Sequence, residues 1–320
     1  MANANLTNAK KAKNDEFYTC LTDIEKEMRH YKAFFKDKIV YCNCDDARES
    51  NFFKYFSLNF EHLGLKKLIC TGFKENGKGV VLVYEGDKNG NRIVDDEEII
   101  VTELNGNGDF RSEECIEFLK EADVVVTNPP FSLFREYVAQ LMEYGKKFLI
   151  IGNGNAVAYK EIFPLIKNNE LWLGASKGIG GKFSFIVPND YNNKFVYEEN
   201  GVRLGQVNSA CWFTNIDHTK RNTELDLYRK YDANAYPKYD NYDAIESKTS
   251  DIPMEYDGVI GVPITFLDKY CPTQFEIVGL MSGAKGDVFT NGTDGRAKFY
   301  INNKGVYARI LIKHKLFSAN

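Results

Sequence analysis

The sequence predicts an α/β fold with a mainly parallel sheet, and three observations support this prediction. Short apolar runs of strand length alternate with amphipathic segments of helix length along residues 22–153. Capping residues or glycines separate many of these elements. One apolar run ends in Asn128, so a polar side chain stands where α/β sheets bind ligands. Alternation of this kind indicates parallel strands joined by crossover helices.

The first elements predict a strand–helix–strand unit. Residues 22–25 (TDIE) resemble a capping box that opens a helix. The apolar positions of that helix share one face: Ile24, Met28, Tyr31 and Phe35. A strand over residues 38–44 follows, and Ser50 is expected to cap a helix that Gly64 ends. The next strand is expected over residues 66–72.

The middle of the chain predicts a hairpin and then a return to alternation. Residues 79–104 are rich in strand-forming residues, with the sequence DKNGN as a hairpin turn. Residues 112–123 (SEECIEFLKEAD) predict a short helix that leads into the strand VVVT. After a further helix, residues 146–153 (KKFLIIGN) predict one more strand.

Two consecutive prolines end the strand VVVT. Neither can donate a ladder hydrogen bond, and Pro130 keeps Pro129 out of the α region, so the chain leaves the sheet in a stiff corner. Ser132 is expected to be the N-cap of the following helix, and Gly145 is expected to be its C′ stop. Apolar residues at helical spacing support that helix: Leu133, Phe134, Tyr137, Val138, Leu141 and Met142.

The character of the chain changes near residue 175. The segments GASKGIGGK, YPKYDNYDAI and TNGTDGRAKFYINNKG are rich in glycine, asparagine and aromatic residues. We therefore expect residues 1–174 to form the main core, and residues 175–320 to hold the remaining core strands and a second, irregular region.

The composition is that of a soluble globular protein. Hydrophobic residues make up 43% of the 320 residues, which is enough for a sizeable core. The N-terminal sequence lacks the apolar run of a signal peptide, and no apolar run is long enough to cross a membrane, so we expect a cytoplasmic protein with no membrane partner. The seven cysteines are scattered and are expected to be reduced core residues. The four histidines match no zinc spacing, so no metal is expected.

The charge pattern alone does not identify a partner. The formal net charge of −4 argues against a protein whose whole surface binds nucleic acid, although a local basic face would suffice. Basic clusters lie near both ends of the chain and, taken alone, are typical of solvated tails. Their members are Lys10, Lys11 and Lys13, then Lys313, His314 and Lys315.

Phosphate-binding loops are not supported. The sequence around Gly180–Lys182 has Ser176 where a Walker loop needs glycine and Phe183 where it needs serine or threonine. The segments GNGNAV and GNGDFR each lack the last glycine of the dinucleotide fingerprint. A nicotinamide-dependent enzyme is therefore disfavoured.

The corner at Asn128 suits one chemical task. An amino group on a heterocycle is a poor nucleophile because its lone pair is delocalised into the ring. If the Asn128 side-chain oxygen and the Pro129 carbonyl each accept one N–H, the lone pair can be aimed at an electrophilic methyl group while Phe131 stacks on the ring. For the tetrapeptide alone, a plain turn capped by Asn128 stays open as the alternative.

The rest of the sequence adds a family resemblance. The segments that carry it are DEFYT, VYCNCDD, SNFFKYF, GLKKLI, GDFRS, VVTNPPFSLFREY, KKFLII, YPKYDNYDAI and GVPITFLDKY. With these segments the chain resembles the EcoRI-type adenine-specific DNA methyltransferases, which are class I N6-adenine methyltransferases dependent on S-adenosylmethionine (AdoMet). The resemblance implies a Rossmann-like, mainly parallel seven-stranded sheet, a C-terminal target-recognition region, and duplex DNA as the substrate.

The resemblance also implies which residues bind AdoMet. Phe17, Tyr18 and Thr19 match the motif along its methionine end, although Phe17 alone could equally pack a loop onto the domain. Asn43, Asp45 and Asp46 lie in the turn where acids hold its ammonium group. This turn lacks the usual glycines, so which acid makes the contact stays open. Asp109 and Phe110 match the contact with the adenine ring, and Asn128 borders the same site.

The proposed catalytic residues are those of the corner itself: Asn128, Pro129, Pro130 and Phe131. A base inside duplex DNA does not present its N6, so the enzyme is expected to flip it out. Phe131 would stack on one face of the base, and Phe183 or Phe185 on the other, with burial in the core as the alternative for these two. Lys10, Lys11 and Lys13 are candidates for phosphate contacts, and Lys177, Lys182 and Arg203 for base readout.

The resemblance suggests GAATTC or a related target and a monomer that works alongside a restriction endonuclease without a stable complex. Three alternatives stay open: methylation of guanine N2 in RNA, methylation of a protein glutamine amide, and a DNA-binding protein that has lost catalysis. Cytosine C5 methylation is excluded because it needs a Pro-Cys nucleophile, and the only adjacent pair, Cys271-Pro272, has the reverse order.

Overall fold

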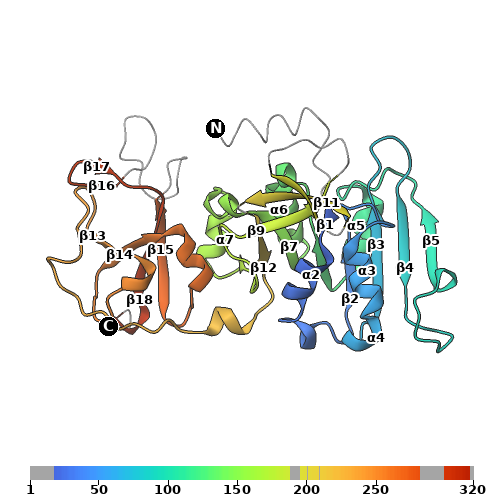
Figure 1. Ribbon diagram of the computed structural model, residues 1–320, viewed down its shortest axis with the longest axis horizontal. Helices are drawn as coiled ribbons and strands as arrows, with labels where there is room; N and C mark the ends of the chain where they lie inside the picture. The colour runs from blue at the N-terminus through green and yellow to red at the C-terminus, as the bar shows by residue number, and fades with distance from the viewer. Residues whose placement is uncertain (1–17, 188–194, 200, 209, 282–298, 318–320) are drawn as a thin grey trace. The chain divides into compact units, whose positions relative to one another are not determined.

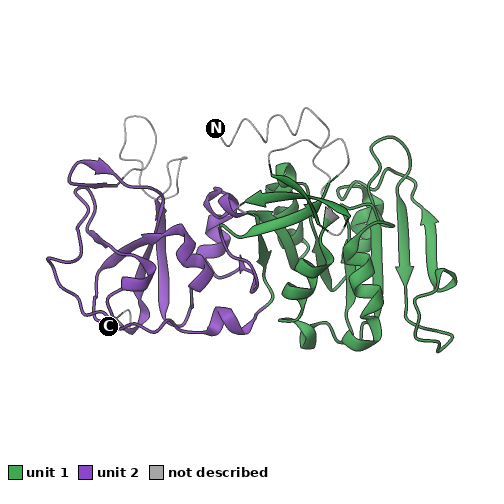
Figure 2. Cartoon of the chain, in the orientation of Figure 1, with its two compact units in different colours: residues 1–153, 180–216 green, residues 154–179, 217–320 purple. Residues whose placement is uncertain are grey.

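A computed structural model describes residues 18–187, 195–199, 201–208, 210–281 and 299–317, and the chain forms two compact units. The first unit comprises residues 1–153 and 180–216, and the second comprises residues 154–179 and 217–320 (Figure 2). Residues 180–216 therefore return to the first unit and supply it with further strands.

A central sheet forms the middle of the first unit. Its strands from this unit follow the order β5-β4-β3-β2-β6-β7-β12 (Figure 1). They are β2 (Ile39–Cys42), β3 (Lys67–Gly72), β4 (Val80–Tyr84), β5 (Ile99–Glu103), β6 (Val124–Thr127), β7 (Lys147–Asn153) and β12 (Ala210–Thr214). The four strands β3, β2, β6 and β7 run parallel, while β4, β5 and β12 add antiparallel flanks. The α/β class is confirmed.

Helices cover both faces of this sheet because alternate strand residues point to opposite sides. Val40 and Val124 join Ile24 and Phe52 in one core cluster, which places α2 and α3 on that face. On the other face, Tyr41 contacts Phe118 and Phe213 contacts Phe134. The helices of the first unit are α2 (Leu21–Met28), α3 (Asn51–Leu58), α4 (Phe60–Leu63), α5 (Glu113–Glu121) and α6 (Phe134–Glu143), with the 3₁₀ turns η1 (Lys32–Phe34), η2 (Asp96–Glu98) and η3 (Phe131–Leu133).

Three helix boundaries confirm the sequence prediction. The Ser50 hydroxyl accepts the backbone N–H of Phe52 and caps α3. Gly64 and Gly145 both take positive φ angles, 63° and 61°, just beyond the ends of α4 and α6. A residue with a Cβ would be strained in that conformation, so glycine ends both helices.

Two predicted helix starts were wrong. The Thr22 capping box does not form, because the Cys20 carbonyl accepts the N–H groups of Asp23 and Ile24 and α2 begins at Leu21. Ser132 is not an N-cap: the Pro130 carbonyl accepts the Leu133 N–H at 2.9 Å. This tighter 3₁₀ turn, η3, comes first, and α6 begins only at Phe134.

A small antiparallel sheet completes the first unit. Its order is β1-β9-β11-β10, with β1 (Tyr18–Thr19), β9 (Lys182–Ile186), β10 (Val196–Glu199) and β11 (Val202–Asn208). β1 pairs with β9 through Thr19 opposite Phe185.

The second unit has its own four-stranded sheet in the order β13-β14-β18-β15. The strands of that sheet are β13 (Ala244–Glu246), β14 (Val259–Pro263), β15 (Phe275–Met281) and β18 (Arg309–His314). The second unit also contains β8 (Trp172–Leu173) and the paired strands β16 (Tyr300–Ile301) and β17 (Lys304–Gly305). Its helices are α7 (Phe163–Lys167), η4 (Gly154–Ala158), η5 (Thr219–Asn222), η6 (Thr249–Asp251), η7 (Ile264–Lys269) and η8 (Lys315–Phe317). No helix within the described ranges has the length and apolarity to span a membrane.

We predict that Gly152→Ala destabilises the first unit. A Cβ at Gly152 would overlap the ring of Phe134, which is 1% exposed and cannot swing into solvent. Overpacking of this kind costs about 1–3 kcal/mol of unfolding free energy, which urea denaturation would measure. The control is Gly106→Ala, whose Cβ meets no atom within 4 Å and whose effect should stay within about 0.5 kcal/mol. Equal stability of the two variants would contradict the prediction.

Candidate active site

Two parallel strands end side by side at the candidate site. In β2 and β6, Val40 pairs with Val124 and Tyr41 with Val125. The Thr127 hydroxyl at the end of β6 donates a hydrogen bond to the Asn43 carbonyl, which follows β2. Asn128 comes directly after Thr127. Asn43 and Asn128 therefore lie at the same carboxyl edge of the sheet, where α/β folds bind ligands.

A tyrosine of α6 holds the side chain of Asn43 in place. The Tyr137 hydroxyl donates to Asn43 Oδ1 at 2.5 Å, and the Cys44 thiol donates to the same oxygen at 3.4 Å. Tyr137 is fully buried, and burial raises the pKa of its hydroxyl well above the ordinary value. Tyr137 thus remains a protonated donor at neutral pH.

The same helix holds a second loop, residues 107–111. The rings of Phe110 and Tyr137 meet edge to face, with centroids 5.0 Å apart. Gln140 donates from Nε2 to the Phe110 carbonyl at 3.2 Å. The helix that follows the proline corner therefore contacts both loops that the sequence analysis assigned to the cofactor.

Asp109 forms a paired interaction with Arg111. Its carboxylate accepts from Arg111 Nη2 at 2.6 Å and from Nε at 2.9 Å. These hydrogen bonds lower the pKa of Asp109, so its carboxylate is ionised at neutral pH. The oxygen lone pairs that Arg111 leaves can accept an amino group of a ligand.

Close backbone approach at this edge comes from glycines outside the turn after β2. A Cβ at Gly72 would lie 2.8 Å from the Ala47 backbone nitrogen, and a Cβ at Gly108 would overlap the Gly72 carbonyl oxygen. The turn of residues 44–47 has no glycine, yet Gly72 and Gly108 leave room for it. Gly72 and Gly108 in neighbouring segments thus permit the close backbone approach that glycines within the turn itself would otherwise allow.

The two acids of this turn differ in environment. Asp46 is exposed, and its Oδ1 accepts the Arg48 N–H at 2.9 Å, which closes the turn. Asp45 is half-buried and accepts from the Ser50 hydroxyl at 3.3 Å. After burial, the charge of Asp45 is the largest cause that raises the pKa of the Cys44 thiol. Asp45 is therefore the more buried of the two acids and is linked to the N-terminus of α3 through Ser50.

These groups suit the two ends of AdoMet. A carboxylate such as that of Asp45 can pair with an ammonium group, and Asp109 beside the Phe110 ring can accept from an adenine amino group. The set offers oxygen acceptors and an apolar surface close together, which is the chemistry that a zwitterionic nucleoside needs.

The proline corner is only partly exposed, and the side-chain oxygen Oδ1 of Asn128 is buried. Asn128 and Phe131 are half-buried and Pro129 is buried, with no cis peptide bond among the described residues. Phe131 packs partly against the core cluster beneath α3, so its ring is supported on one side. A rigid, partly exposed ring is suited to stacking on a base.

Other predicted residues fall elsewhere. Thr19 is buried in β1, and its carbonyl accepts from Asn51 Nδ2 at 2.8 Å; the side chain of Tyr18 is not described. Lys182 is exposed at the start of β9 and Arg203 is half-buried in the neighbouring β11, whereas Lys177 belongs to the second unit. Four predicted positions lie outside the described residues: Lys10, Lys11, Lys13 and Phe17.

The expectation that Phe183 or Phe185 stacks on a flipped base needs correction. Both rings are 0% exposed and stack on each other, with centroids 5.8 Å apart. Phe183 also contacts Trp212. Both residues belong to the core between the two sheets of the first unit, and neither has surface for a ligand.

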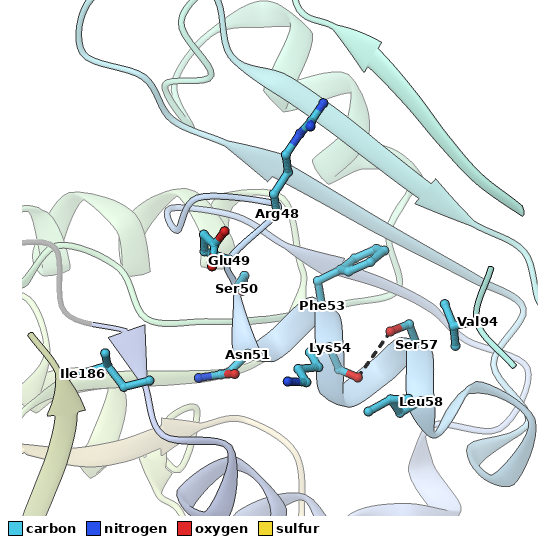
Figure 3. Close-up of a pocket in the computed structure, with 10 residues that line it drawn as sticks. All are labelled: Arg48, Glu49, Ser50, Asn51, Phe53, Lys54, Ser57, Leu58, Val94 and Ile186. Atoms are coloured by element: carbon cyan, nitrogen blue, oxygen red, sulfur yellow. Dashed lines mark hydrogen bonds between the residues drawn. The ribbon is translucent and has the colours of Figure 1, made fainter. Parts of the chain in front are cut away.

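A pocket of about 530 Å³ lies beside α3 (Figure 3). It is lined by Arg48, Glu49, Ser50, Asn51, Phe53, Lys54, Ser57, Leu58, Val94 and Ile186. None of these is a predicted site residue, but Ser50 donates to Asp45 and Asn51 donates to the Thr19 carbonyl, so the pocket borders the predicted cofactor residues.

Three further residues shape the site but had no functional prediction from the sequence: Thr127, Tyr137 and Gln140. Tyr137 entered the prediction only as one of the residues at helical spacing. A hydroxyl at such a position, directed at a strand end, leaves no local signal in the sequence.

Comparisons with known proteins identify the family of this chain. A family model described as "Adenine-specific methyltransferase EcoRI" matches residues 5–315. The chain is 51% identical over 325 residues to the Type II methyltransferase M.EcoRI of Escherichia coli, covering 97% of this chain and 96% of that protein. It is 38% identical to M.MgeORF184P of Mycoplasma genitalium and to M.MpnI of Mycoplasma pneumoniae, covering 95% and 96% of this chain and 97% of each of those proteins.

We predict that Tyr137→Phe weakens the binding of S-adenosylhomocysteine, the demethylated form of AdoMet, by about 2- to 12-fold, because Asn43 loses its main donor. Calorimetry would measure the affinity. The matched control is Tyr41→Phe, which removes a buried hydroxyl bonded at 2.8 Å to Thr71 instead of Asn43. Both variants should lose similar stability, but only Tyr137→Phe should lose affinity. Equal affinity in the two variants would refute this role for Tyr137.

Proposed function

This chain belongs to the family of EcoRI adenine-specific methyltransferases, and from this premise we propose how its residues carry out the reaction. The protein is a Type II DNA methyltransferase that modifies adenine as the methylating half of a restriction–modification system. We propose that it transfers a methyl group from AdoMet to N6 of an adenine flipped out of duplex DNA.

The main support for this proposal is the position of Asn128 beside Asn43 at one edge of the sheet. Asn128 follows β6 at the same sheet edge as Asn43, which Thr127 and Tyr137 hold in place. The amine-binding corner and the expected cofactor turn are therefore neighbours on one rigid sheet. Such placement can align a reacting amine with a methyl donor.

In the proposed reaction, AdoMet supplies an electrophilic methyl group. The Asn128 side-chain oxygen and the Pro129 carbonyl accept the two N–H groups of the adenine, and Phe131 stacks on its ring. The two acceptors would leave the nitrogen lone pair free to attack the methyl group of a bound AdoMet, and the carbon–nitrogen bond would form as the carbon–sulfur bond breaks and S-adenosylhomocysteine leaves. No covalent bond to the protein forms, and a proton passes from the methylated nitrogen to water.

We assign the cofactor contacts from the environments of the acids. Asp45 is proposed to hold the ammonium group, since Asp46 is exposed and occupied in closing the turn. Asp109, kept ionised by Arg111, is proposed to accept the adenine amino group beside Phe110. Asn43 is proposed to border the methionine end. Phe17, Tyr18 and Thr19 are assigned there by family resemblance.

DNA contacts are proposed for two regions. Lys182 and Arg203 lie on neighbouring strands of the small sheet, and Lys177 lies in the second unit, which is proposed to carry target recognition. Lys10, Lys11 and Lys13 are proposed to contact phosphates. The proposed target is GAATTC or a related site, and the enzyme is proposed to act as a monomer without a stable complex with its endonuclease.

Family membership decides among the alternatives raised by the sequence. Methylation of guanine in RNA or of a glutamine amide shares the Asn-Pro-Pro corner, but the family match extends over residues 5–315. A non-catalytic protein is not favoured, because the corner from Asn128 to Phe131 is intact.

We expect Asn128→Ala to lower methyl transfer by on the order of 100-fold or more while AdoMet binding stays nearly unchanged, since the acceptor acts on the reacting amine. Transfer of labelled methyl to DNA, followed by digestion and nucleoside analysis, would measure this and would also identify N6-methyladenine. Asn128→Asp is the matched variant, because it keeps an acceptor oxygen, and it should retain more activity. Near-normal turnover by Asn128→Ala would rule out the role proposed for Asn128.

We also expect the affinity for duplex DNA to fall steeply as salt is raised, because phosphate contacts release counterions. Lys182→Ala should reduce the slope of log K against log salt by about one. The control is Lys67→Ala, at the amino end of β3, where Lys67 pairs with Glu121 at 2.8 Å. A complex insensitive to salt, or the same slope change in both variants, would contradict the assignment.

A further inference from the structure

The connection between β4 and β5 carries side-chain oxygens at a regular spacing. Its sequence from residue 87 to residue 98 is DKNGNRIVDDEE. The side chains that we consider as ligands are Asp87, Asn89, Asn91, Asp95 and Glu98, while the carboxylates of Asp96 and Glu97 are exposed. We propose that this loop binds one calcium ion, which is a site separate from the methyltransferase reaction.

The spacing is that of a twelve-residue calcium loop. Such loops take ligands from positions 1, 3, 5, 7, 9 and 12, with a carbonyl at position 7 and a bidentate glutamate at position 12. Counted from Asp87, position 7 is Ile93 and position 12 is Glu98. Position 6 needs a sharp turn and is usually glycine; here it is Arg92, which takes a positive φ of 64°.

The backbone already wraps around these oxygens. The Asp87 carboxylate accepts the N–H groups of Gly90 at 2.6 Å and Arg92 at 2.7 Å. Asn89 Oδ1 accepts the Asn91 N–H at 2.9 Å, and Asn91 Oδ1 accepts the Ile93 N–H at 2.7 Å. These bonds alone describe a turn and do not require an ion.

Glu98 supplies the independent observation. Glu98 is only 9% exposed. Its Oε1 accepts the N–H groups of Lys88 at 2.7 Å and Asn89 at 3.2 Å, so the carboxylate points into the loop. Within the described part of the chain, Oε2 is buried and has no hydrogen-bond partner. A buried carboxylate oxygen without a partner is costly, and a cation at the loop centre would satisfy it.

The Asp95 carboxylate is tied to the same loop. Asn89 and Asn91 both donate from Nδ2 to Asp95 Oδ2, at 2.9 and 2.6 Å. After burial, the charges of Glu98, Asp87, Glu61 and Asp95 raise the pKa of the Tyr84 hydroxyl. The ammonium of Lys88 is paired at 3.1 Å with Glu85, on a side chain that is 57% exposed. The loop thus concentrates negative charge.

The ligand chemistry favours calcium. All candidate ligands are oxygens, which excludes the nitrogen and sulfur sites typical of zinc. Histidine, cysteine and acidic side chains alone form no metal group of three among the described residues, so the proposed site also requires the Asn89 and Asn91 amide oxygens and a backbone carbonyl as ligands. Calcium accepts six to eight such ligands in flexible geometry, whereas magnesium demands a near-ideal octahedron and keeps several waters.

The loop lies away from the reaction. Tyr84 at its start pairs with Leu68 near the amino end of β3, while Val80 pairs with Gly72 at the carboxyl edge. Val94 within the loop packs against the core cluster and lines the pocket beside α3 (Figure 3). A bound ion would therefore stabilise the β4–β5 hairpin and its contact with α3, and the proposal does not depend on the methyl-transfer chemistry.

The test begins with the full-length protein stripped by a chelator. Titration with calcium chloride in a calorimeter should show one site with a dissociation constant of about 10⁻⁵ to 10⁻³ M, since two ligands are neutral amides and position 6 is not glycine. Calcium at about 100-fold above that constant should raise the melting temperature by roughly 5 °C. Magnesium should bind at least about 10-fold more weakly. Absence of a calcium-dependent shift at about 100 mM calcium, roughly 100-fold above the weakest expected constant, would overturn the proposal.

Two variants test the ligands. Glu98→Gln and Asp87→Asn should each abolish the calcium-dependent shift or weaken calcium binding by about 10-fold or more, while both fold without calcium. The controls are Glu97→Gln and Asp96→Asn, which remove equal charge from exposed neighbours. A full calcium response in Glu98→Gln, or an equal loss in the controls, would show that general charge rather than this loop is responsible.

A spectroscopic measurement covers the case in which a ligand variant fails to fold. Terbium in place of calcium should be sensitised by Tyr84, whose hydroxyl lies near the carboxylates of the loop. Tyr84→Phe should lose most of the terbium emission but keep the calcium-dependent rise in melting temperature. Unchanged emission in Tyr84→Phe, or emission that excess calcium does not quench, would place the ion elsewhere and overturn the assignment.

Discussion

The hydrogen bond from Tyr137 to Asn43 is the interaction on which the arrangement of the site depends. It joins a helix that begins just after the proline corner to a turn that follows a different strand. Thr127 makes a second bond to the same residue from the end of β6. Since both bonds are buried, the separation of the corner from the cofactor turn is set by rigid groups, as alignment of an amine and a methyl donor requires.

The carboxyl edge of the sheet also depends on close backbone packing. Gly72 and Gly108 lie where any side chain would overlap a neighbouring backbone atom. They allow the loops after β2, β3 and β5 to meet, although the turn after β2 has no glycine of its own. The opposite edge has a different organisation, in which a loop of carboxylates and amides between β4 and β5 concentrates negative charge around Glu98.

Local rules made much of the fold predictable. The caps at Ser50, Gly64 and Gly145 depend on residues within a few positions, and their geometry follows from side-chain chemistry and the freedom of glycine at positive φ. The prediction at Ser132 was wrong because the Pro130 carbonyl accepts the Leu133 N–H and closes a 3₁₀ turn before α6 begins. The sequence left both stacking and burial open for Phe183 and Phe185, because residue type alone does not distinguish a ring in the core from a ring that faces a ligand.

The sequence by itself determined the α/β class, the stiff corner from Asn128 to Phe131 and the family, because these are written in neighbouring residues and in motifs shared along the whole chain. Only the tertiary structure decided that Tyr137 reaches Asn43, that Asp45 is half-buried whereas Asp46 is exposed, and that residues 180–216 return to the first unit. The burial of the Glu98 oxygen Oε2 is likewise visible only in the tertiary structure. Each of these depends on contacts between segments distant in sequence, whose burial no local pattern encodes.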